Sequence, residues 1–207
     1  MILGAIAPNN KGDKRTTLHP ESIKPILDMG IEVIFESGLC QGIDISDEEM
    51  SKIGAKALTR EECLKTSDLL FTSTSITTEE IHLMKKGSIL LGLLEPFSNK
   101  EQFNYFTKQE ISAISMEFMP RITRAQKMDV LSSQSNLAGY VAVIESAKNL
   151  NSALPMMMTA AGTLRPASVF VIGVGVAGLQ AIATAKRLGA KVEAFDTRAI
   201  VEEQVKS

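Results

Sequence analysis

The sequence has few cysteines and few histidines. Its 207 residues include two cysteines, Cys40 and Cys63, and two histidines, His19 and His82. None of these side chains lies at a metal-ligand spacing such as CxxC, so the sequence predicts no metal site. The two cysteines stand in unrelated contexts, and free cysteine is commonly buried as a small apolar residue. We therefore predict two buried free thiols rather than a disulfide.

An excess of charge of one sign is also lacking, and so are long apolar runs. The 22 basic and 24 acidic residues leave a formal net charge of -2, which provides no strong field for nucleic acid or an anionic membrane. The longest apolar run, Val169–Leu179, contains glycines and is well short of the roughly 20 residues that a spanning helix requires. At the N-terminus the first basic residue follows the short apolar run, which is the reverse of a signal peptide. We therefore expect a protein of the cytosol or of a surface facing it.

Short apolar runs alternate with helix-like segments through most of the chain. The runs are continuously apolar, which is typical of strands buried on both faces of a parallel sheet. Capping-box sequences mark three helix starts, at Ser46–Glu49, Thr59–Glu62 and Thr77–Glu80. This alternation predicts a doubly wound, flavodoxin-like or Rossmann-like α/β domain over residues 1–132. The predicted strands are Ile2–Ala7, Ile31–Glu36, Leu69–Thr72, Ile89–Leu93 and Ile111–Ser115.

A different pattern follows this first domain. Apolar residues at positions 137, 141, 144 and 147 recur at the spacing of one helix face. We expect this long helix, residues 133–151, to connect the first domain to a second. Residues 152–207 then form the first part of a Rossmann dinucleotide-binding domain. Its predicted elements are a buried strand Ser168–Ile172, a helix Leu179–Leu188 and a second strand Lys191–Phe195.

The glycine-rich turn after the strand Ser168–Ile172 is a motif of dinucleotide-binding proteins. It runs from Gly173 to Gly178 and reads GVGVAG. The first glycine of such a motif permits a tight turn, the second lets backbone approach a pyrophosphate, and the third lets helix and strand pack closely. The following helix N-terminus offers N–H groups to phosphates. The predicted cofactor-binding residues are Gly173, Gly175, Val176, Ala177, Gly178, Asp196, Thr197 and Arg198.

Asp196 indicates which dinucleotide would bind. It lies 18 residues after Gly178, near the spacing expected for a carboxylate that holds the adenosine ribose hydroxyls. A carboxylate there favours NAD over NADP, because it would repel a 2′-phosphate. Arg198 is a signal in the opposite direction, and we interpret it as a solvated or intersubunit arginine. The alternative for the whole motif is a purely structural glycine turn.

A polar loop, Met119–Ser133, is the second candidate feature. It contains two arginines, a glutamine, an aspartate and serines, and it follows a strand end, where α/β proteins bind their ligands. Composition leaves two interpretations open. The loop could cap the long helix, with Asp129, Ser132 or Ser133 as the N-cap residue, or it could bind a phosphate or a carboxamide.

Two segments closely resemble a known family. Pro120–Tyr140 and Ala160–Arg198 are similar to the NAD-binding component of the proton-translocating NAD(P) transhydrogenase alpha subunit, in the alanine dehydrogenase/transhydrogenase family. The N-terminal segment resembles that family more loosely. The family's loop holds an Arg, a Gln, an Asp and a Ser that contact the nicotinamide half of NAD(H) and the facing NADP(H)-binding component. The matching residues, which the resemblance implies are catalytic, are Arg121, Gln126, Asp129 and Ser132.

The resemblance implies a reaction without a side-chain acid or base. Hydride would pass directly from NADH to NADP⁺ bound on a partner component, coupled to proton translocation in the full complex. The protein would contribute positioning and a dry site. The implied partners are a second copy in a homodimer, the NADP(H)-binding component and a membrane-spanning component. The chain would then lie in the cytoplasm, peripheral to the inner membrane through its partners.

Two other hypotheses remain. An alanine dehydrogenase would need a substrate-binding Lys after the third strand and a catalytic His near the fourth, but Leu70–Thr74 and Gly92–Pro96 hold neither. Thr72 and Ile76 also replace a Lys and a Pro that are usual in the transhydrogenase pattern.

The other hypothesis concerns the length of the second domain. A complete dinucleotide fold would need on the order of 100 more residues. We therefore expect a C-terminally truncated chain, inactive alone, or a remnant or dimerising module that binds NAD weakly.

Overall fold

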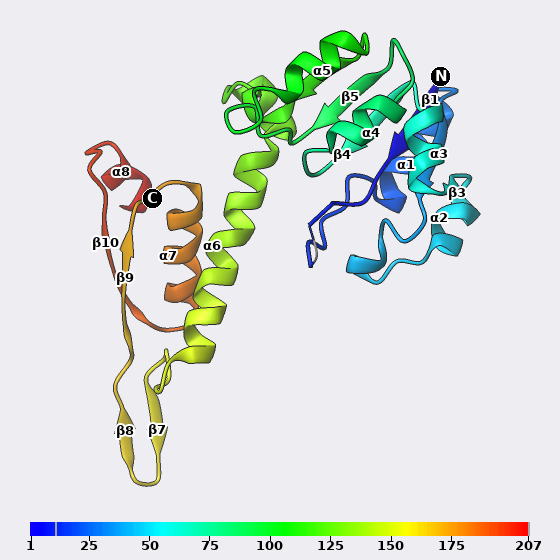
Figure 1. The fold of residues 1–207 in the computed structure, drawn as a ribbon. Helices are drawn as coiled ribbons and strands as arrows, with labels where there is room; N and C mark the ends of the chain where they lie inside the picture. The colour runs from blue at the N-terminus through cyan, green and yellow to red at the C-terminus, as the bar shows by residue number, and fades with distance from the viewer. Residues whose placement is uncertain (11, 207) are drawn as a thin grey trace. The chain divides into compact units, whose positions relative to one another are not determined.

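Six parallel strands form the sheet of the first unit, Met1–Met128, in the computed structural model, which describes residues 1–10 and 12–206 (Figure 1). Their order across the sheet is β3-β2-β1-β4-β5-β6. The chain proceeds outward from β1 in one direction and then from β4 in the other, which confirms the predicted doubly wound fold. The strands are β1 (Ile2–Ala5), β2 (Glu32–Glu36), β3 (Lys56–Leu58), β4 (Leu69–Thr72), β5 (Ile89–Gly92) and β6 (Ser112–Ser115).

Strand β3 is the one strand of this sheet that the sequence patterns did not predict. It has three residues, begins with the exposed Lys56, and pairs along Ile34–Glu36 of β2. A strand this short at the edge of a sheet carries too few residues to show a period. The other strands lie where continuous apolar runs predicted them.

Helices cover both faces of this sheet. They are α1 (Pro20–Asp28), α2 (Asp47–Ile53), α3 (Arg60–Thr66), α4 (Thr78–Leu83) and α5 (Gln102–Lys108), with 3₁₀ turns η1 (Gln41–Ile43), η2 (Met116–Phe118) and η3 (Thr123–Met128). Val33 and Phe35 belong to the core that includes residues of α1 and α2, whereas Ile34 belongs to the core with residues of α3, α4 and α5. Because neighbours along β2 enter opposite cores, this strand is buried on both faces, as predicted.

The three predicted capping boxes are present. The N–H groups of Ser46, Thr59 and Thr77 donate to the carboxylates of the glutamates three residues later, at 2.8, 2.8 and 2.7 Å. In each box the Ser or Thr hydroxyl accepts from the backbone N–H of the same glutamate. The local sequence therefore determines where α2, α3 and α4 begin.

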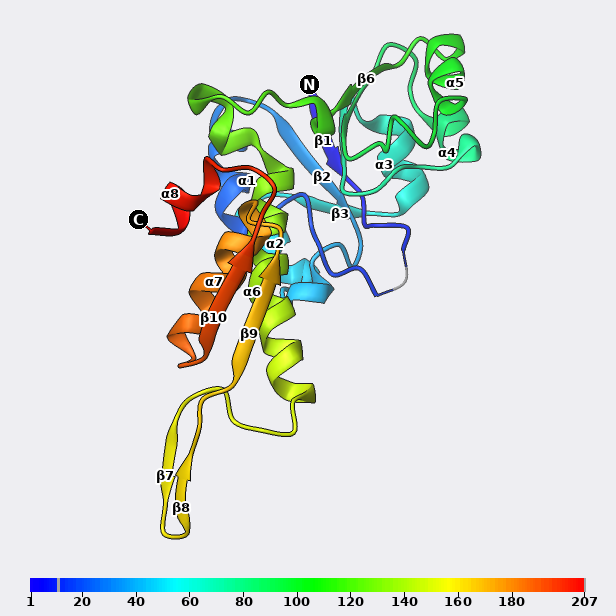
Figure 2. The same cartoon turned by 90° about the vertical axis from the view of Figure 1, so that its left-hand side faces the viewer.

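The second unit, Asp129–Ser207, consists of a small sheet, two longer helices and a hairpin. Strands β9 (Ser168–Ile172) and β10 (Lys191–Phe195) pair in parallel, and β7 (Met157–Thr159) pairs with β8 (Gly162–Leu164) in an antiparallel hairpin. Helix α6 (Val130–Asn149) lies beside α7 (Val176–Arg187), which packs on β9 and β10 (Figures 1 and 2). A short helix, α8 (Val201–Lys206), follows β10.

The buried face of α6 agrees with the predicted one only in part, because Ala147 packs against the core that contains Val143 and Ile144 is half-buried. Leu137 and Val141 are 56% and 52% exposed, while Gly139 and Val143 are buried. The reason is the closeness of α7, since a Cβ on Gly139 would lie 2.1 Å from the carbonyl oxygen of Ala177. A contact this close selects the smallest residue, so the face that packs on α7 is not the one with the largest apolar side chains.

Strand β9 is covered on one face within the second unit, which corrects the prediction of a buried strand. Val169 and Val171 pack in cores with residues of α7. Phe170 and Ile172 point the other way and are 61% and 78% exposed. Within residues 1–10 and 12–206, no helix combines the length and the apolar character that crossing a bilayer requires.

Candidate functional site

The glycine turn joins β9 to α7 in a tight backbone path. Gly173 has a φ of 91°, in the left-handed region that favours glycine. Its N–H donates to the carbonyl oxygen of Phe195 at 2.8 Å, which holds the turn against the end of β10. A Cβ on Gly178 would lie 1.9 Å from the Gly173 carbonyl oxygen, so the third glycine is required for the first turn of α7 to pack on the loop.

Within the second unit, there is open space beside Gly175 at the N-terminus of α7. Gly175 is the N-cap residue, and the hydrogen bond from Leu179 N–H to Gly175 O, at 2.8 Å, is the first of the i to i−4 type in this helix. The N–H groups of Val176, Ala177 and Gly178 precede it and so carry the partial positive charge of the helix end. A Cβ on Gly175 would meet no atom within 4 Å. Backbone here is therefore open to close approach by an anionic group such as a pyrophosphate.

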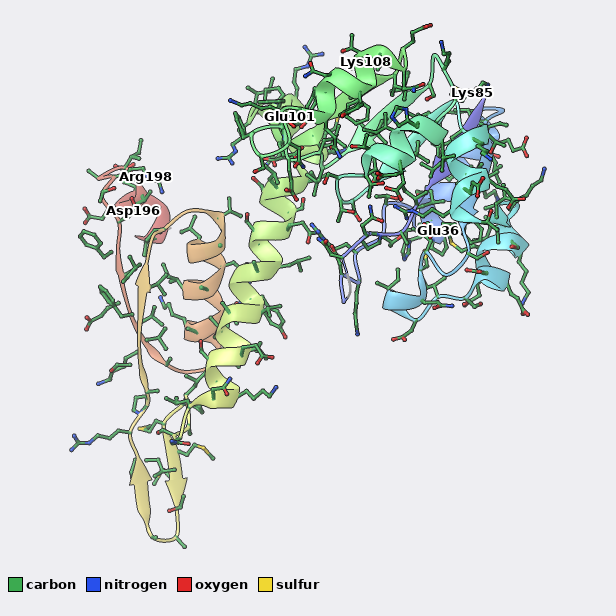
Figure 3. The ribbon with its side chains drawn as sticks, viewed as in Figure 1. Glu36, Lys85, Glu101, Lys108, Asp196 and Arg198 are labelled. Atoms are coloured by element: carbon green, nitrogen blue, oxygen red, sulfur yellow. The ribbon has the colours of Figure 1, made fainter. Side chains whose placement is uncertain are left out.

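Asp196 lies beside this turn, at the end of β10 (Figure 3). Its Oδ2 accepts from the Val174 N–H at 2.7 Å and from Arg198 Nη2 at 3.0 Å. Its Oδ1 accepts from the Arg198 N–H at 2.8 Å and from Arg198 Nε at 3.0 Å. The structure thus brings together Asp196, Arg198 and the second residue of the glycine turn.

The electrostatics of this cluster keep Asp196 ionised. The hydrogen bonds from the Arg198 side chain, followed by the backbone bonds from Val174 and Arg198, hold the pKa of the Asp196 carboxyl well below its usual range. The Asp196 side chain is 7% exposed, whereas that of Arg198 is 58% exposed. A shallow pocket of about 230 Å³ lies against them, and its walls are Ile172, Gly173, Phe195, Asp196, Thr197 and Arg198.

The polar loop contributes to both units. Arg121 and Gln126 belong to the first unit and are exposed, with Gln126 in the turn η3 next to the buried Ala125. Asp129 and Ser132 belong to the second unit. Asp129 is the N-cap of α6 and accepts from the Ser132 N–H at 2.9 Å and from its hydroxyl at 2.6 Å. The capping interpretation is therefore confirmed for Asp129.

Within the second unit, the capped end of α6 and the glycine turn lie toward the same end. Gly139 meets Ala177 near the start of α7, and Asn136 Nδ2 donates to Gln180 Oε1 at 3.2 Å. Figures 1 and 2 show the two helices running in the same direction. At 1.5 Å per residue, Ser132 lies about 10 Å beyond Gly139 along α6. Asp129 and Ser132 therefore project past the helix end that carries the glycine turn.

Two contributors to this arrangement were not found from the sequence. Gly139 sets the distance between α6 and α7, and the only sequence signal for it is the small pair Ala138-Gly139. The Val174 N–H holds Asp196 through backbone, which no side-chain pattern reports. Gly139 and the Val174 N–H fix where the predicted site residues lie, and neither adds a side chain to the site.

The segment that follows β4 in the first unit presents hydroxyl groups. Thr72 donates its hydroxyl to the Thr74 carbonyl at 2.5 Å, and Thr74 Oγ1 accepts from the Asn9 N–H at 3.1 Å. Elsewhere in this unit, Arg15 forms an ion pair with Asp13 at 2.6 Å. Over residues 1–10 and 12–206, no cluster of three or more His, Cys, Asp or Glu side chains could hold a metal ion.

Two family models match the chain. "Alanine dehydrogenase/PNT, N-terminal domain" matches residues 6–138 and "Alanine dehydrogenase/PNT, C-terminal domain" matches residues 142–207. An NAD(P) transhydrogenase subunit alpha protein of Rhodospirillum rubrum is 48% identical over 202 residues, covering 95% of this chain and 53% of that protein. The protein of the same name from Rickettsia prowazekii is 42% identical, over 100% of this chain and 55% of its own length.

Two solved structures are similar to the chain along its whole length. The crystal structure of transhydrogenase from Sinorhizobium meliloti matches with a TM-score of 0.96 at 43% identity, over 100% of this chain and 62% of that one. An L-alanine dehydrogenase matches with a TM-score of 0.87 at 20% identity, which supports the shared fold alone. The chain spans about half the length of the curated transhydrogenase relatives named above.

Proposed function

The chain belongs to the alanine dehydrogenase/PNT family, and on this premise we propose that it is the NAD(H)-binding part of an NAD(P) transhydrogenase. The observation that carries the proposal is the ionised Asp196 held beside the glycine turn by Val174. Identity of 48% to a transhydrogenase alpha subunit supports the same assignment.

The residues of the turn fit a dinucleotide. The N–H groups at the start of α7 would hold the pyrophosphate, and the absence of a side chain at Gly175 would let it approach the backbone. Asp196 would accept hydrogen bonds from the adenosine ribose hydroxyls. Thr197 and Arg198, which line the same pocket, would lie beside that ribose.

The polar loop would act at the nicotinamide half. Asp129 and Ser132 extend beyond the end of α7 that carries the glycine turn, and we propose that they position the nicotinamide. The family resemblance alone implies the same role for Arg121 and Gln126. The chemistry of the step belongs to the nicotinamide rings, since hydride leaves NADH with its electron pair and reduces NADP⁺ on a partner component. The chain's own residues would orient the donor and exclude water, which lowers the barrier by proximity.

The wider assembly follows from the same assignment. We propose that the protein works as a homodimer with an NADP(H)-binding component and a membrane-spanning component that couples the reaction to proton translocation. It would be cytoplasmic and peripheral to the inner membrane through these partners. The segment at the carboxyl end of β4, with Thr72 and Thr74, contains no lysine or histidine. It therefore does not favour an amino-acid dehydrogenase.

A two-substrate assay tests the proposal. The chain is mixed with NADH, NADP⁺ and the NADP(H)-binding component of a transhydrogenase, and in a second reaction with NADH, pyruvate and ammonia. We expect reduction of NADP⁺ and no consumption of pyruvate. Gln126→Ala, which alters an exposed side chain, should slow transfer while the circular dichroism spectrum stays unchanged. Turnover with pyruvate, or an unaltered rate in the variant, would refute the corresponding assignment.

A further inference from the structure

Both oxygens of the Asp196 carboxylate are already fully used within the chain. Each oxygen accepts one backbone N–H and one N–H of the Arg198 guanidinium. The side chain is only 7% exposed, so solvent supplies little additional space around it. A ribose that presents two hydroxyl donors to this carboxylate therefore needs the places that the guanidinium occupies.

Asp196 would accept the same number of hydrogen bonds before and after the ribose replaces the guanidinium. Two guanidinium N–H groups leave and two ribose hydroxyls replace them, while the backbone bonds from Val174 and Arg198 stay in place. The pair that must break is a forked one, with Nε on Oδ1 and Nη2 on Oδ2, both at 3.0 Å. Because Arg198 is 58% exposed, its side chain can leave without disturbing packed residues.

The displaced guanidinium would remain at the rim of the site. Arg198 lines the 230 Å³ pocket with Thr197 and also a second, 320 Å³ pocket on the side of Ala199. A forked guanidinium is suited to bind phosphate with two parallel hydrogen bonds. Because Arg198 and Asp196 line the same pocket, the guanidinium would be near a ribose bound there, on which NADP(H) carries a 2′-phosphate in place of one of the two hydroxyls.

We propose that Arg198 is a specificity-determining residue of this site, where it competes with the NAD(H) ribose for Asp196 and, when displaced, pairs with a 2′-phosphate. The proposal rests on the proposed NAD(H) function. It has the consequence that Arg198 weakens binding of NADH and strengthens binding of NADPH. Arg198 would thus reduce the ratio of NADH affinity to NADPH affinity, which the carboxylate of Asp196 would otherwise make larger.

Opposite effects on the two ligands test this proposal. NADH and NADPH are titrated by calorimetry into the chain, Arg198→Ala and the control Arg187→Ala, which removes the same charge from the far end of α7. Exposed ion pairs contribute little, so we expect Arg198→Ala to bind NADH about two- to five-fold more tightly and NADPH more weakly by at least a similar factor. Arg187→Ala should leave the affinities for NADH and for NADPH unchanged.

A second variant separates charge from geometry. Arg198→Lys keeps the charge but not the fork, so we expect tighter NADH binding with most of the NADPH affinity retained. Weaker NADH binding in Arg198→Ala, equal changes for both ligands, or no change for either would overturn the role of Arg198. If the unsubstituted chain bound no NADH, the proposed function would fail, and this inference with it.

Discussion

Two glycines of the same turn should respond in opposite ways to one added methyl group. In Gly178→Ala the new Cβ would lie 1.9 Å from the Gly173 carbonyl oxygen and 2.9 Å from its carbonyl carbon, both backbone atoms. In Gly175→Ala the Cβ would meet nothing within 4 Å, and the φ of -83° is one that alanine adopts without strain. The first change therefore disturbs the fold, and the second only fills space in front of α7.

The magnitudes follow from these distances. Relieving a backbone contact below 2 Å requires the start of α7 to move away from the turn, and overpacking of this kind costs about 1–3 kcal/mol. Alanine is about 1 kcal/mol better than glycine inside a helix, which offsets part of that cost at Gly178. We expect a net loss of about 1 kcal/mol, and at most about 2 kcal/mol, for Gly178→Ala, and a change within about 0.5 kcal/mol for Gly175→Ala.

Two measurements separate the variants. Hydrogen exchange of the β9 and β10 amides reports the stability of the second unit. NADH fluorescence reports binding without interference, because the chain has no tryptophan. Gly178→Ala should accelerate exchange, whereas Gly175→Ala should leave exchange unchanged and still lose most NADH binding. Equal acceleration in both variants, or full NADH binding in Gly175→Ala, would refute the assignment of roles within the turn.

Three predictions concern the first unit. Arg60 donates to Glu80 at 2.5 Å, to Glu36 at 2.7 Å and to the Ala7 carbonyl at 2.9 Å, with Glu36 labelled in Figure 3. Arg60→Met should therefore cost about 2–4 kcal/mol in urea unfolding, because it leaves two half-buried carboxylates without their cation. Burial alone would raise the pKa of Glu80, but the hydrogen bonds from Arg60, the Thr77 N–H and Asn9, together with the positive charge of Arg60, outweigh it and lower the pKa. The ionised Glu80 therefore stabilises the fold at pH values above the unfolded glutamate pKa of about 4.3, and this stabilisation should be lost as the pH falls below that value. In Arg60→Met this part of the acid dependence should be absent. An unchanged acid transition in that variant would contradict the role of this ion pair. Burial raises the pKa of the Cys63 thiol to about 12, and burial also raises that of Cys40, so a thiol reagent should label neither cysteine before unfolding and both after it. Rapid labelling of the folded chain would show that these side chains are accessible.

Local patterns predicted most of the fold because they act within a few residues. A Ser or Thr three residues before a Glu satisfies helix N–H groups wherever it occurs, so the starts of α2, α3 and α4 could be predicted. Continuous apolar runs likewise predicted the strands of the first unit other than β3, and also β9 and β10. The free, buried cysteines also followed from composition and were confirmed.

Features that depend on a distant neighbour were not predictable in this way. The buried face of α6 depends on how closely α7 approaches at Gly139, and hydrophobic spacing selected the exposed Leu137 and Val141 instead. The sequence predicted Asp196 and Arg198 as site residues. It did not predict their forked ion pair, because that pair depends on the backbone course after β10.

The most direct test of NAD(H) binding is a map of where NADH acts on the chain. Backbone amide shifts are recorded by NMR during a titration of the ¹⁵N-labelled chain with NADH. We predict that the largest shifts fall on Val174–Leu179 and on Asp196–Arg198, the segments that form the turn and hold the ribose. No shifts at the highest NADH concentration, or shifts confined to the first unit, would contradict NAD(H) binding at this turn.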